Sequence, residues 1–345
     1  MSLDPIFEPL RQMPAPNFDD IPAAREQVAS LQSSLPRRQS ATVTFDDRTI
    51  DGGSGKLKVR VYDPHGSGTR GALLYLHGGG FVVGDLDSEH SQCIDHAEQA
   101  GCVVVSVDYR LAPEFPFPAA HDDAWAALGW LVAHADELRI DPERLAVGGG
   151  SAGATLAAGV ALRSRDEGSP RIRLALLVQP ALDHLQTQPS ARNFADTPFL
   201  NKESLPLIWR TYFGATPPTG KALSYAAPAA AEKLTGFPPA CLIVGDVDPL
   251  RDEGLVFAMR LVADGAEVEL HLVPGAPHGF DLVEHAPVTR LMRTVQAAAL
   301  SRALSSNGDW TRRLIALESS VRFHGPVLWA LLKRLASRPS RRGPE

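Results

Sequence analysis

Short apolar runs recur along the chain at long intervals, and most of them show no alternation of apolar and polar residues. Uninterrupted runs rich in Val, Leu and Ile are typical of strands buried on both faces of a sheet. The apolar runs, most of them unalternated, predict six strands at residues 73–76, 103–107, 145–147, 174–178, 241–244 and 268–273. Residues 41–63 differ, because ATVTFDDRTI and KLKVRVYD alternate and are separated by glycines, which predicts two strands joined by a turn.

Helical periodicity fills several of the intervals between these strands. In HDDAWAALGWLVAHADEL an apolar stripe is formed by Ala124, Leu128, Leu131 and Leu138, and residues 152–163 are dense in helix-forming residues. Strands that alternate with connections of helical length are typical of a parallel sheet with helices on both faces. The predicted fold class is therefore α/β.

Two regions interrupt this rhythm. Residues 1–40 are punctuated by prolines and only loosely helical, and residues 183–236 combine several prolines with an aromatic group but no clear strand. The aromatic residues are Phe194, Phe199, Trp209, Tyr212 and Phe213. An insertion between two strands is a common way to build a lid or a substrate pocket, and the alternative is a surface excursion that packs its aromatic side chains inward.

Net charge separates the end of the chain from the rest. The 345 residues carry a formal charge of −6, which is too mildly acidic to indicate a nucleic-acid partner. Residues 301–345 contain nine Lys/Arg and three Asp/Glu, a net charge of +6, so residues 1–300 carry −12. This difference predicts that residues 305–345 form a basic extension distinct from the body of the protein.

Within this extension, residues 310–336 show apolar residues at helical spacing, with a break near Gly325 and Pro326. A basic amphipathic helix can lie on an anionic membrane, so peripheral membrane contact is one hypothesis. The alternatives are packing against the body, a contact within a homodimer, and a disordered end.

The cysteines and the N-terminal sequence bear on cellular location. Cys93, Cys102 and Cys241 stand at unrelated spacings, which predicts neither a disulfide framework nor a zinc site. MSLDPIFEPLRQMPAPNFDD lacks the apolar core of a signal peptide, and no run approaches 18 apolar residues. We therefore expect a cytoplasmic protein without a bound metal.

The strongest chemical signal is the sequence from Gly149 to Gly153, Gly-Gly-Ser-Ala-Gly, which follows one predicted strand and precedes a predicted helix. The pattern Gly-x-Ser-x-Gly at such a turn exposes a nucleophilic serine, here Ser151, above the edge of a sheet. The same letters also fit the dinucleotide-binding pattern Gly-x-Gly-x-x-Gly. That pattern needs an acidic residue at the end of the next strand, whereas Asp166 and Glu167 precede that strand.

A second signal is His77 with the three glycines that follow it, directly after the strand at 73–76. Glycine amides can turn toward a developing oxyanion, where each donor contributes about 3–4 kcal/mol. A flexible glycine turn is the alternative interpretation. Its place upstream of Gly-x-Ser-x-Gly is nevertheless the arrangement that esterases use.

A serine nucleophile needs a base and an acid, and the loops after the next two strands supply candidates. Asp246 and Asp248 follow the strand at 241–244, and His278 follows the strand at 268–273. These loops lie at the carboxyl ends of their strands, where α/β active sites assemble. His278 is the preferred base and Asp248 the preferred acid, with Asp246 as its rival and helix capping as the alternative role for either aspartate.

Five ordered motifs resemble the hormone-sensitive-lipase-like branch of the α/β-hydrolase superfamily. They are HGGGF at 77–81, DYRLAPEFPFPAA at 108–120, GGSAG at 149–153, DPLRDEG at 248–254 and HGF at 278–280, so the resemblance covers about residues 40–300. It implies an α/β-hydrolase fold with a mostly parallel sheet, flanking helices, a helical cap and no cofactor. It also implies a triad of Ser151, Asp248 and His278, with oxyanion-hole amides from Gly78, Gly79 and Ala152.

The resemblance further divides the chain and marks two departures. Residues 1–40 and 183–236 would form the cap, and residues 41–182 and 237–304 the hydrolase core. Gly150 stands where the family usually has Asp or Thr, and Ala154 where it usually has a second glycine. Three successive glycines lose more backbone entropy on ordering, which puts the rigidity of this turn in doubt. Asp108, Arg110 and Glu114 of the second motif are interpreted as supports for the loops.

The activity that the resemblance implies is hydrolysis of small esters with short- to medium-chain acyl groups. The same triad also permits an amide or arylacetamide deacetylase, or a lactonase. A third alternative is a ligand receptor without catalysis, since the related gibberellin receptors use this fold. Those receptors lack the catalytic histidine, whereas His278 is present here, and function must be argued from the site rather than the fold.

Overall fold

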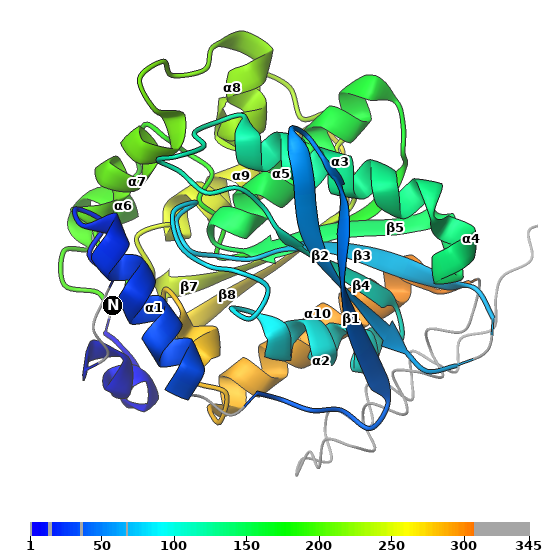
Figure 1. Cartoon of the computed structure of the whole chain (residues 1–345). Coiled ribbons are helices and arrows are strands. Elements are labelled where there is room, and N and C mark those ends of the chain that lie inside the picture. Colours follow the sequence, from blue (N-terminus) through cyan, green and yellow to red (C-terminus); the bar gives the residue numbers. More distant parts are fainter. Residues whose placement is uncertain (1, 13–15, 35–36, 67, 307–345) are drawn as a thin grey trace, which may run out of the picture.

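The central element of the fold is an eight-stranded sheet (Figure 1). The computed structural model describes residues 2–12, 16–34, 37–66 and 68–306. The strands are β1 (Val43–Gly52), β2 (Gly55–Pro64), β3 (Arg70–Leu76), β4 (Val103–Asp108), β5 (Ile140–Gly150), β6 (Ile172–Val178), β7 (Ala240–Val247) and β8 (Val268–Pro277). Their order is β1-β2-β4-β3-β5-β6-β7-β8, and all neighbours are parallel except β1–β2 and β2–β4. Every strand predicted from the apolar pattern is present, so the predicted α/β fold is confirmed.

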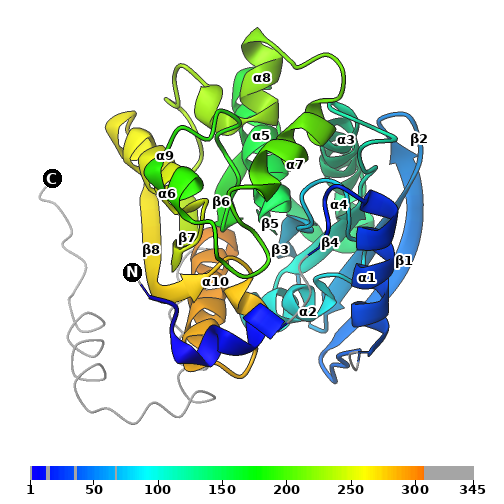
Figure 2. The same ribbon diagram turned by 90° about the vertical axis from the view of Figure 1, so that its left-hand side faces the viewer.

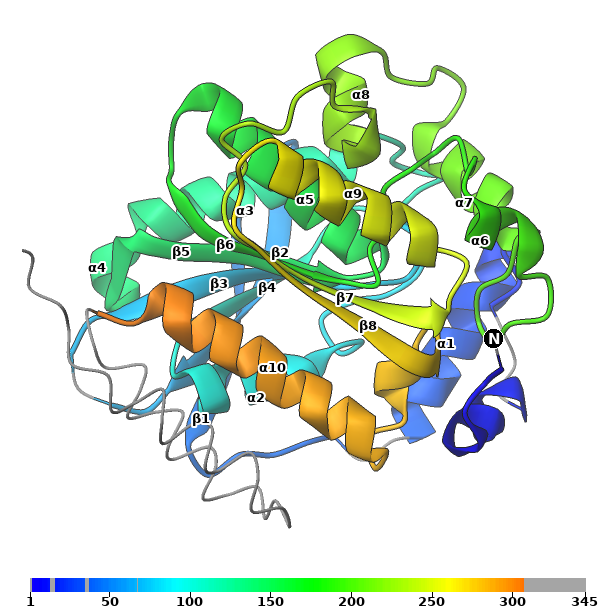
Figure 3. The same ribbon diagram turned by 180° about the vertical axis from the view of Figure 1, so that it is seen from behind.

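Helices cover both faces of this sheet (Figure 3). On one face lie α3 (Ala119–Ala133), α5 (Ala152–Glu167) and α9 (Arg251–Ala263), and on the other lie α2 (His90–Ala100) and α10 (Pro287–Leu304). The helical pattern at 121–138 is divided in the structure, because His134 has a non-helical backbone with φ −106° and ψ 23°. The short helix α4 (Ala135–Leu138) follows it.

Side chains of the central strands enter two hydrophobic cores in alternation. Leu74 and Val105 pack into the core shared with α5, whereas Leu73 and Val104 pack into the core shared with α10. Successive side chains of a strand point to opposite faces of the sheet, so an uninterrupted apolar run fills both cores. This is why the central strands lack the alternation seen in the edge strand β1.

The two segments that interrupt the strand pattern are helical. Their elements are η1 (Pro5–Gln12), α1 (Ile21–Ser34), α6 (Pro189–Asn193), α7 (Ser204–Phe213), α8 (Gly220–Ala226) and η2 (Pro228–Ala230). Figure 2 shows α1, α6 and α7 on the same side of the molecule. An ion pair of 2.9 Å between Arg11 and Asp196 joins the two segments. The aromatic residues of α7 are buried, and Tyr212 stacks on Phe81 with ring centroids 3.7 Å apart.

The basic extension falls almost entirely beyond the described residues, which end at 306. The helices predicted at 310–336, and the membrane or homodimer contacts considered for them, therefore lie outside the described residues. In the part of the chain that the structure describes, no helix combines the length and the apolar character needed to cross a bilayer.

Candidate active site

Ser151 lies at a sharp turn between β5 and α5. Its backbone φ is 52°, in the left-handed region that residues other than glycine rarely adopt. The Ser151 N–H donates to the carbonyl of Val178 at the end of β6 (2.8 Å), and α5 begins at the next residue. A turn of this kind is strained, and it lifts the serine side chain above the edge of the sheet.

The glycines two positions before and after Ser151 leave no room for a side chain. A Cβ at Gly149 would lie 2.3 Å from the carbonyl oxygen of Leu76, and a Cβ at Gly153 would lie 1.9 Å from the same atom. The blocking atom belongs to the backbone at the end of β3, so it cannot rotate away. The glycines of the motif are therefore required by the close approach of β3 to the turn.

Gly153→Ala is expected to destabilise the fold by more than about 3 kcal/mol, because the backbone of β3 must move to admit the methyl group. Gly129→Ala is the matched control, since Gly129 lies inside α3 and a Cβ there meets no atom within 4 Å. That alanine should stabilise the protein by about 0.5–1 kcal/mol through helix propensity. Urea unfolding followed by circular dichroism measures both changes. Equal free energies of unfolding in the two variants would contradict this explanation of the turn.

The structure brings Ser151, His278 and Asp248 into one chain of hydrogen bonds. The distance from Ser151 Oγ to His278 Nε2 is 3.0 Å, and the distance from His278 Nδ1 to Asp248 Oδ2 is 2.9 Å. Asp248 directly follows β7 and His278 directly follows β8. The three side chains thus meet at the carboxyl edge of the parallel strands, as their positions in the sequence predict.

Asp246, the rival acid, faces a different partner. Its Oδ1 accepts a hydrogen bond from the backbone N–H of Gly275 (2.7 Å), and its carbonyl oxygen accepts one from Nη1 of Arg251 (2.9 Å). These contacts connect the end of β7 to Gly275 of β8 and to Arg251, the first residue of α9. The structure therefore places Asp248, and not Asp246, beside the imidazole of His278.

The surroundings of His278 favour a basic imidazole. Burial disfavours its charged form, but the negative charge of Asp248 and the hydrogen bond to it outweigh burial and raise the pKa of His278 above its ordinary value. The Asp248 side chain is fully buried, and its other oxygen, Oδ1, accepts the N–H of Leu250 (2.9 Å). Asp248 can hold a proton on Nδ1 of the imidazole, which leaves Nε2 free to accept the proton of Ser151.

The glycine-rich turn after β3 is braced by aromatic contacts. The ring of His77 stacks on Tyr109 with centroids 4.1 Å apart, and the Tyr109 hydroxyl donates to the His77 carbonyl (2.7 Å). Burial lowers the pKa of His77 to about 4, so this ring is neutral at pH 7. Tyr109 belongs to the motif DYRLAPE, whose Glu114 forms an ion pair of 2.8 Å with Arg25 of α1. These contacts agree with the supporting role expected for that motif.

The backbone amides of the turn differ in their partners. The N–H of Gly78 donates to Oε1 of Glu89 (2.7 Å). Among the described residues, the N–H groups of Gly79, Gly80 and Ala152 have no hydrogen-bond partner, and all three residues line the pocket beside Ser151. These three amides are available to a bound group without breaking an existing hydrogen bond.

An apolar pocket of about 260 Å³ opens onto Ser151 and His278. Both segments that interrupt the strand pattern contribute to its walls. The first segment supplies Pro16, Phe18 and Val28, and the second supplies Phe199, Leu200, Leu205, Ile208 and Trp209. Two of the five aromatic residues noted in the sequence, Phe199 and Trp209, therefore line the pocket.

Gln179 is a residue of the site that the sequence patterns did not indicate. It follows β6 directly and has a φ of 49°. Its Nε2 donates to the carbonyl of Pro277 (2.9 Å), and its Oε1 accepts the N–H of Gly279 (3.1 Å). Gln179 thus fixes the backbone on both sides of His278. Its only signal in the sequence is a position immediately after a strand.

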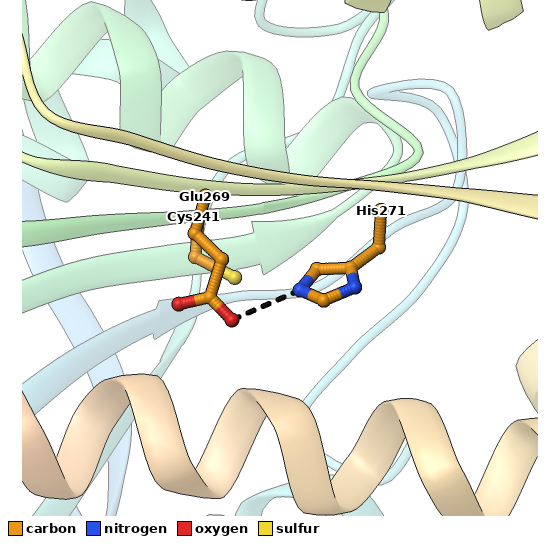
Figure 4. A group of neighbouring side chains, drawn as sticks. All are labelled: Cys241, Glu269 and His271. Carbon is orange, nitrogen blue, oxygen red and sulfur yellow. Dashed lines mark hydrogen bonds and ion pairs between the residues drawn. The ribbon is translucent and has the colours of Figure 1, made fainter. Parts of the chain in front are cut away.

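One group of potential metal ligands occurs in the described part of the chain, and it lies away from Ser151. Donor atoms of Cys241, Glu269 and His271 lie within 4.8 Å of one another, on neighbouring strands that face α10 (Figure 4). Glu269 already accepts a hydrogen bond from His271 (2.9 Å) and forms an ion pair with Arg302. Burial raises the pKa of the Cys241 thiol to about 12, so the thiol keeps its proton. We therefore assign this group no part in the chemistry of the site.

A serine, a histidine and a buried aspartate at the carboxyl edge of a mostly parallel sheet define the class of α/β-hydrolases. The family described as having the alpha/beta hydrolase fold matches residues 73–282 of the chain. Esterase LipI of Mycobacterium tuberculosis is 39% identical over 291 residues, which are 81% of this chain and 88% of LipI. Carboxylesterase NlhH of the same species is 36% identical over 312 residues, 88% of this chain and 96% of NlhH.

Solved structures give the same result. The structure described as a bacterial heroin esterase is 38% identical, with a TM-score of 0.82, and the match covers 88% of this chain and 99% of the other. The chain therefore belongs to the hormone-sensitive-lipase-like family of α/β-hydrolases, as its five motifs predict. It is a carboxylic ester hydrolase.

Proposed function

We propose that the protein hydrolyses small carboxylic esters with short- to medium-chain acyl groups, using Ser151, His278 and Asp248. The observation that carries this proposal is the chain of hydrogen bonds from Asp248 through His278 to Ser151, at 2.9 and 3.0 Å, beside an apolar pocket. This geometry activates a serine hydroxyl for attack on a carbonyl carbon.

The reaction would follow from the positions of these groups. Ser151 Oγ attacks the ester carbonyl while its proton passes to His278 Nε2, and Asp248 stabilises the imidazolium that forms. His278 then returns the proton to the departing alcohol, which leaves an acyl group on Ser151. A water molecule, activated by the same imidazole, releases the acid and restores the hydroxyl. Because His278 must be neutral to accept the first proton, activity should fall as the pH drops through its raised pKa.

The negative oxygen of the tetrahedral intermediate needs hydrogen-bond donors close to Ser151. We assign this role to the amides of Gly79 and Ala152, as expected from the sequence, together with the amide of Gly80. Gly78 could donate to an oxyanion only after giving up its bond to Glu89. Preorganised donors of this kind usually provide the largest single contribution to such catalysis.

The segments 1–40 and 183–236 would act as a cap that selects the substrate. Both contribute walls to the pocket, whose volume of about 260 Å³ lies just below the roughly 300–1,000 Å³ typical of sites for drug-sized ligands. A space of this size with apolar walls favours a short acyl chain and leaves a long chain partly exposed to water.

A series of p-nitrophenyl esters from acetate to dodecanoate tests this proposal. We expect kcat/KM to be highest between acetate and hexanoate and at least about tenfold lower for dodecanoate, since a pocket that is one or more methylenes too small costs about 1–3 kcal/mol. p-Nitroacetanilide is the control for amide hydrolysis. Faster hydrolysis of the anilide than of the acetate ester, or a preference for dodecanoate, would contradict the proposed substrate class.

A further inference from the structure

Glu89 is a carboxyl group of the pocket that the mechanism above does not use. It precedes α2 and lines the pocket together with Ser151. Its Oε1 accepts the N–H of Gly78 (2.7 Å), and its Oε2 accepts the hydroxyl of Tyr75 on β3. Both oxygens therefore fasten Glu89 to the strand and the turn that carry the oxyanion amides.

The same carboxyl group occupies the space beside Gly150, the residue before the nucleophile. A Cβ at Gly150 would lie 3.1 Å from Oε1 and 3.4 Å from Oε2 of Glu89, and the third nearest atom is Cδ of the same side chain. No other residue supplies any of these three nearest atoms. The missing side chain at position 150 and the carboxyl group of Glu89 thus compete for one volume.

We propose that Glu89 is a positioning residue that replaces the side chain absent at Gly150 and ties the glycine-rich turn to the nucleophile turn. This inference rests on the proposed function, because the two turns matter for catalysis only if they hold Ser151 and the oxyanion amides. By holding Gly78, Glu89 fixes the backbone from which the amides of Gly79 and Gly80 extend. The contact of Glu89 with Gly150 also supports the nucleophile turn, whose rigidity the three successive glycines before Ser151 put in doubt.

The ionised form of Glu89 suits this role best, because two donors face its two oxygens. Burial away from water and the charge of Asp281 raise the pKa of Glu89 to about 7, although the hydrogen bonds from Tyr75 and Gly78 act in the opposite direction. Protonation, as the pH falls through this value, removes an acceptor site from Gly78 or Tyr75. The titratable or charged groups that surround it or line the same pocket are Tyr75, Cys93, Tyr109, His278, Asp281 and Arg293.

Four variants test the proposal by hydrolysis of p-nitrophenyl butyrate, with thermal unfolding of each variant as a check on folding. Glu89→Ala removes the carboxyl group, and Glu89→Gln keeps its shape but cannot ionise. Gly150→Asp combined with Glu89→Ala supplies a carboxyl group from the other side, into the space that the alanine vacates. Glu232→Gln is the matched control, since this glutamate is exposed and does not line the pocket.

We expect Glu89→Ala to lower kcat by about 100-fold with little change in KM, because a small displacement of catalytic groups has an effect of this size. The double variant should recover at least about tenfold of that loss. In the parent, the acid limb of kcat/KM should be steeper than a single titration allows, since Glu89 and His278 both protonate there. Glu89→Gln should restore the slope of one.

The proposal is overturned if Glu89→Ala keeps the kcat of the parent. It is also overturned if Glu89→Ala unfolds at the same temperature as the parent and the double variant recovers none of the lost kcat. A slope that is the same in the parent and in Glu89→Gln also overturns it. Failure of the proposed function gives a different result, because neither the parent nor Glu232→Gln would then hydrolyse the ester.

Discussion

Ser151→Ala is expected to lower kcat for p-nitrophenyl butyrate by about 10⁶-fold, which leaves only the rate that oxyanion donors and binding provide. The methyl group has no proton to give to His278 and no oxygen to attack the carbonyl. The variant should fold normally, because among the residues that the structure describes the Ser151 hydroxyl hydrogen-bonds only to His278, and its loss affects stability by about 1 kcal/mol. The φ of 52° at this position is as accessible to alanine as to serine.

Ser224→Ala is the matched control for this change. Ser224 lies on α8, its hydroxyl donates to the carbonyl of Lys221 (2.7 Å), and it does not line the pocket. The Ser224→Ala variant should hydrolyse the ester at the rate of the parent. An organophosphonate should label the parent and Ser224→Ala but not Ser151→Ala, as intact-protein mass spectrometry would show. Labelling of Ser151→Ala to the same extent would contradict the assignment of the nucleophile.

The fold could be predicted well because its strands are buried on both faces. The run at residues 174–178 has no polar position, and the one at 103–107 has only the buried Ser106, as expected of a strand that lies between two layers of helices. The break at His134 could not be predicted, because only the backbone conformation of this one residue changes, while the apolar stripe continues past it. Local pattern therefore indicates which elements exist better than where they end.

The candidate site could be predicted to the extent that its residues follow strands directly. Ser151, Asp248 and His278 each come within one residue of a strand end, and parallel strands carry their ends to the same edge. The choice between Asp246 and Asp248 was open, because both follow the same apolar run closely; in the structure Asp246 belongs to the end of β7 and Asp248 comes directly after it. It depends on which carboxylate reaches the imidazole, and that is a matter of three-dimensional geometry.

Contacts between side chains far apart in the sequence account for what the sequence could not indicate. Gln179 supports His278 through its bond to Gly279, which lies 100 residues further along the chain. Glu89 reaches Gly78 and the space beside Gly150 although nothing in its own neighbourhood marks it. Neither residue belongs to a motif. Each holds the backbone beside a motif residue, Gln179 beside His278 and Glu89 beside Gly79.

Asp248→Asn is expected to lower kcat by about 10⁴-fold at pH 7, with little change in the fold. Asparagine fills the same volume, but its amide can present N–H groups to the imidazole, where the carboxylate accepts a hydrogen bond from Nδ1–H (2.9 Å). The imidazole then prefers to carry its proton on Nε2, the nitrogen that must accept the proton of Ser151. The base is therefore present in its proper place but in the wrong tautomer.

Asp246→Asn is the sharpest control, because it makes the same chemical change two residues away. The carbonyl oxygen of asparagine can still accept the N–H of Gly275, which Oδ1 of Asp246 now accepts (2.7 Å), so kcat should stay within about threefold of the parent. Steady-state hydrolysis of p-nitrophenyl butyrate measures both variants. Similar losses in the two would mean that the carboxylates act through the stability of the end of β7, whereas a difference of several thousandfold assigns the charge that His278 needs to Asp248 alone.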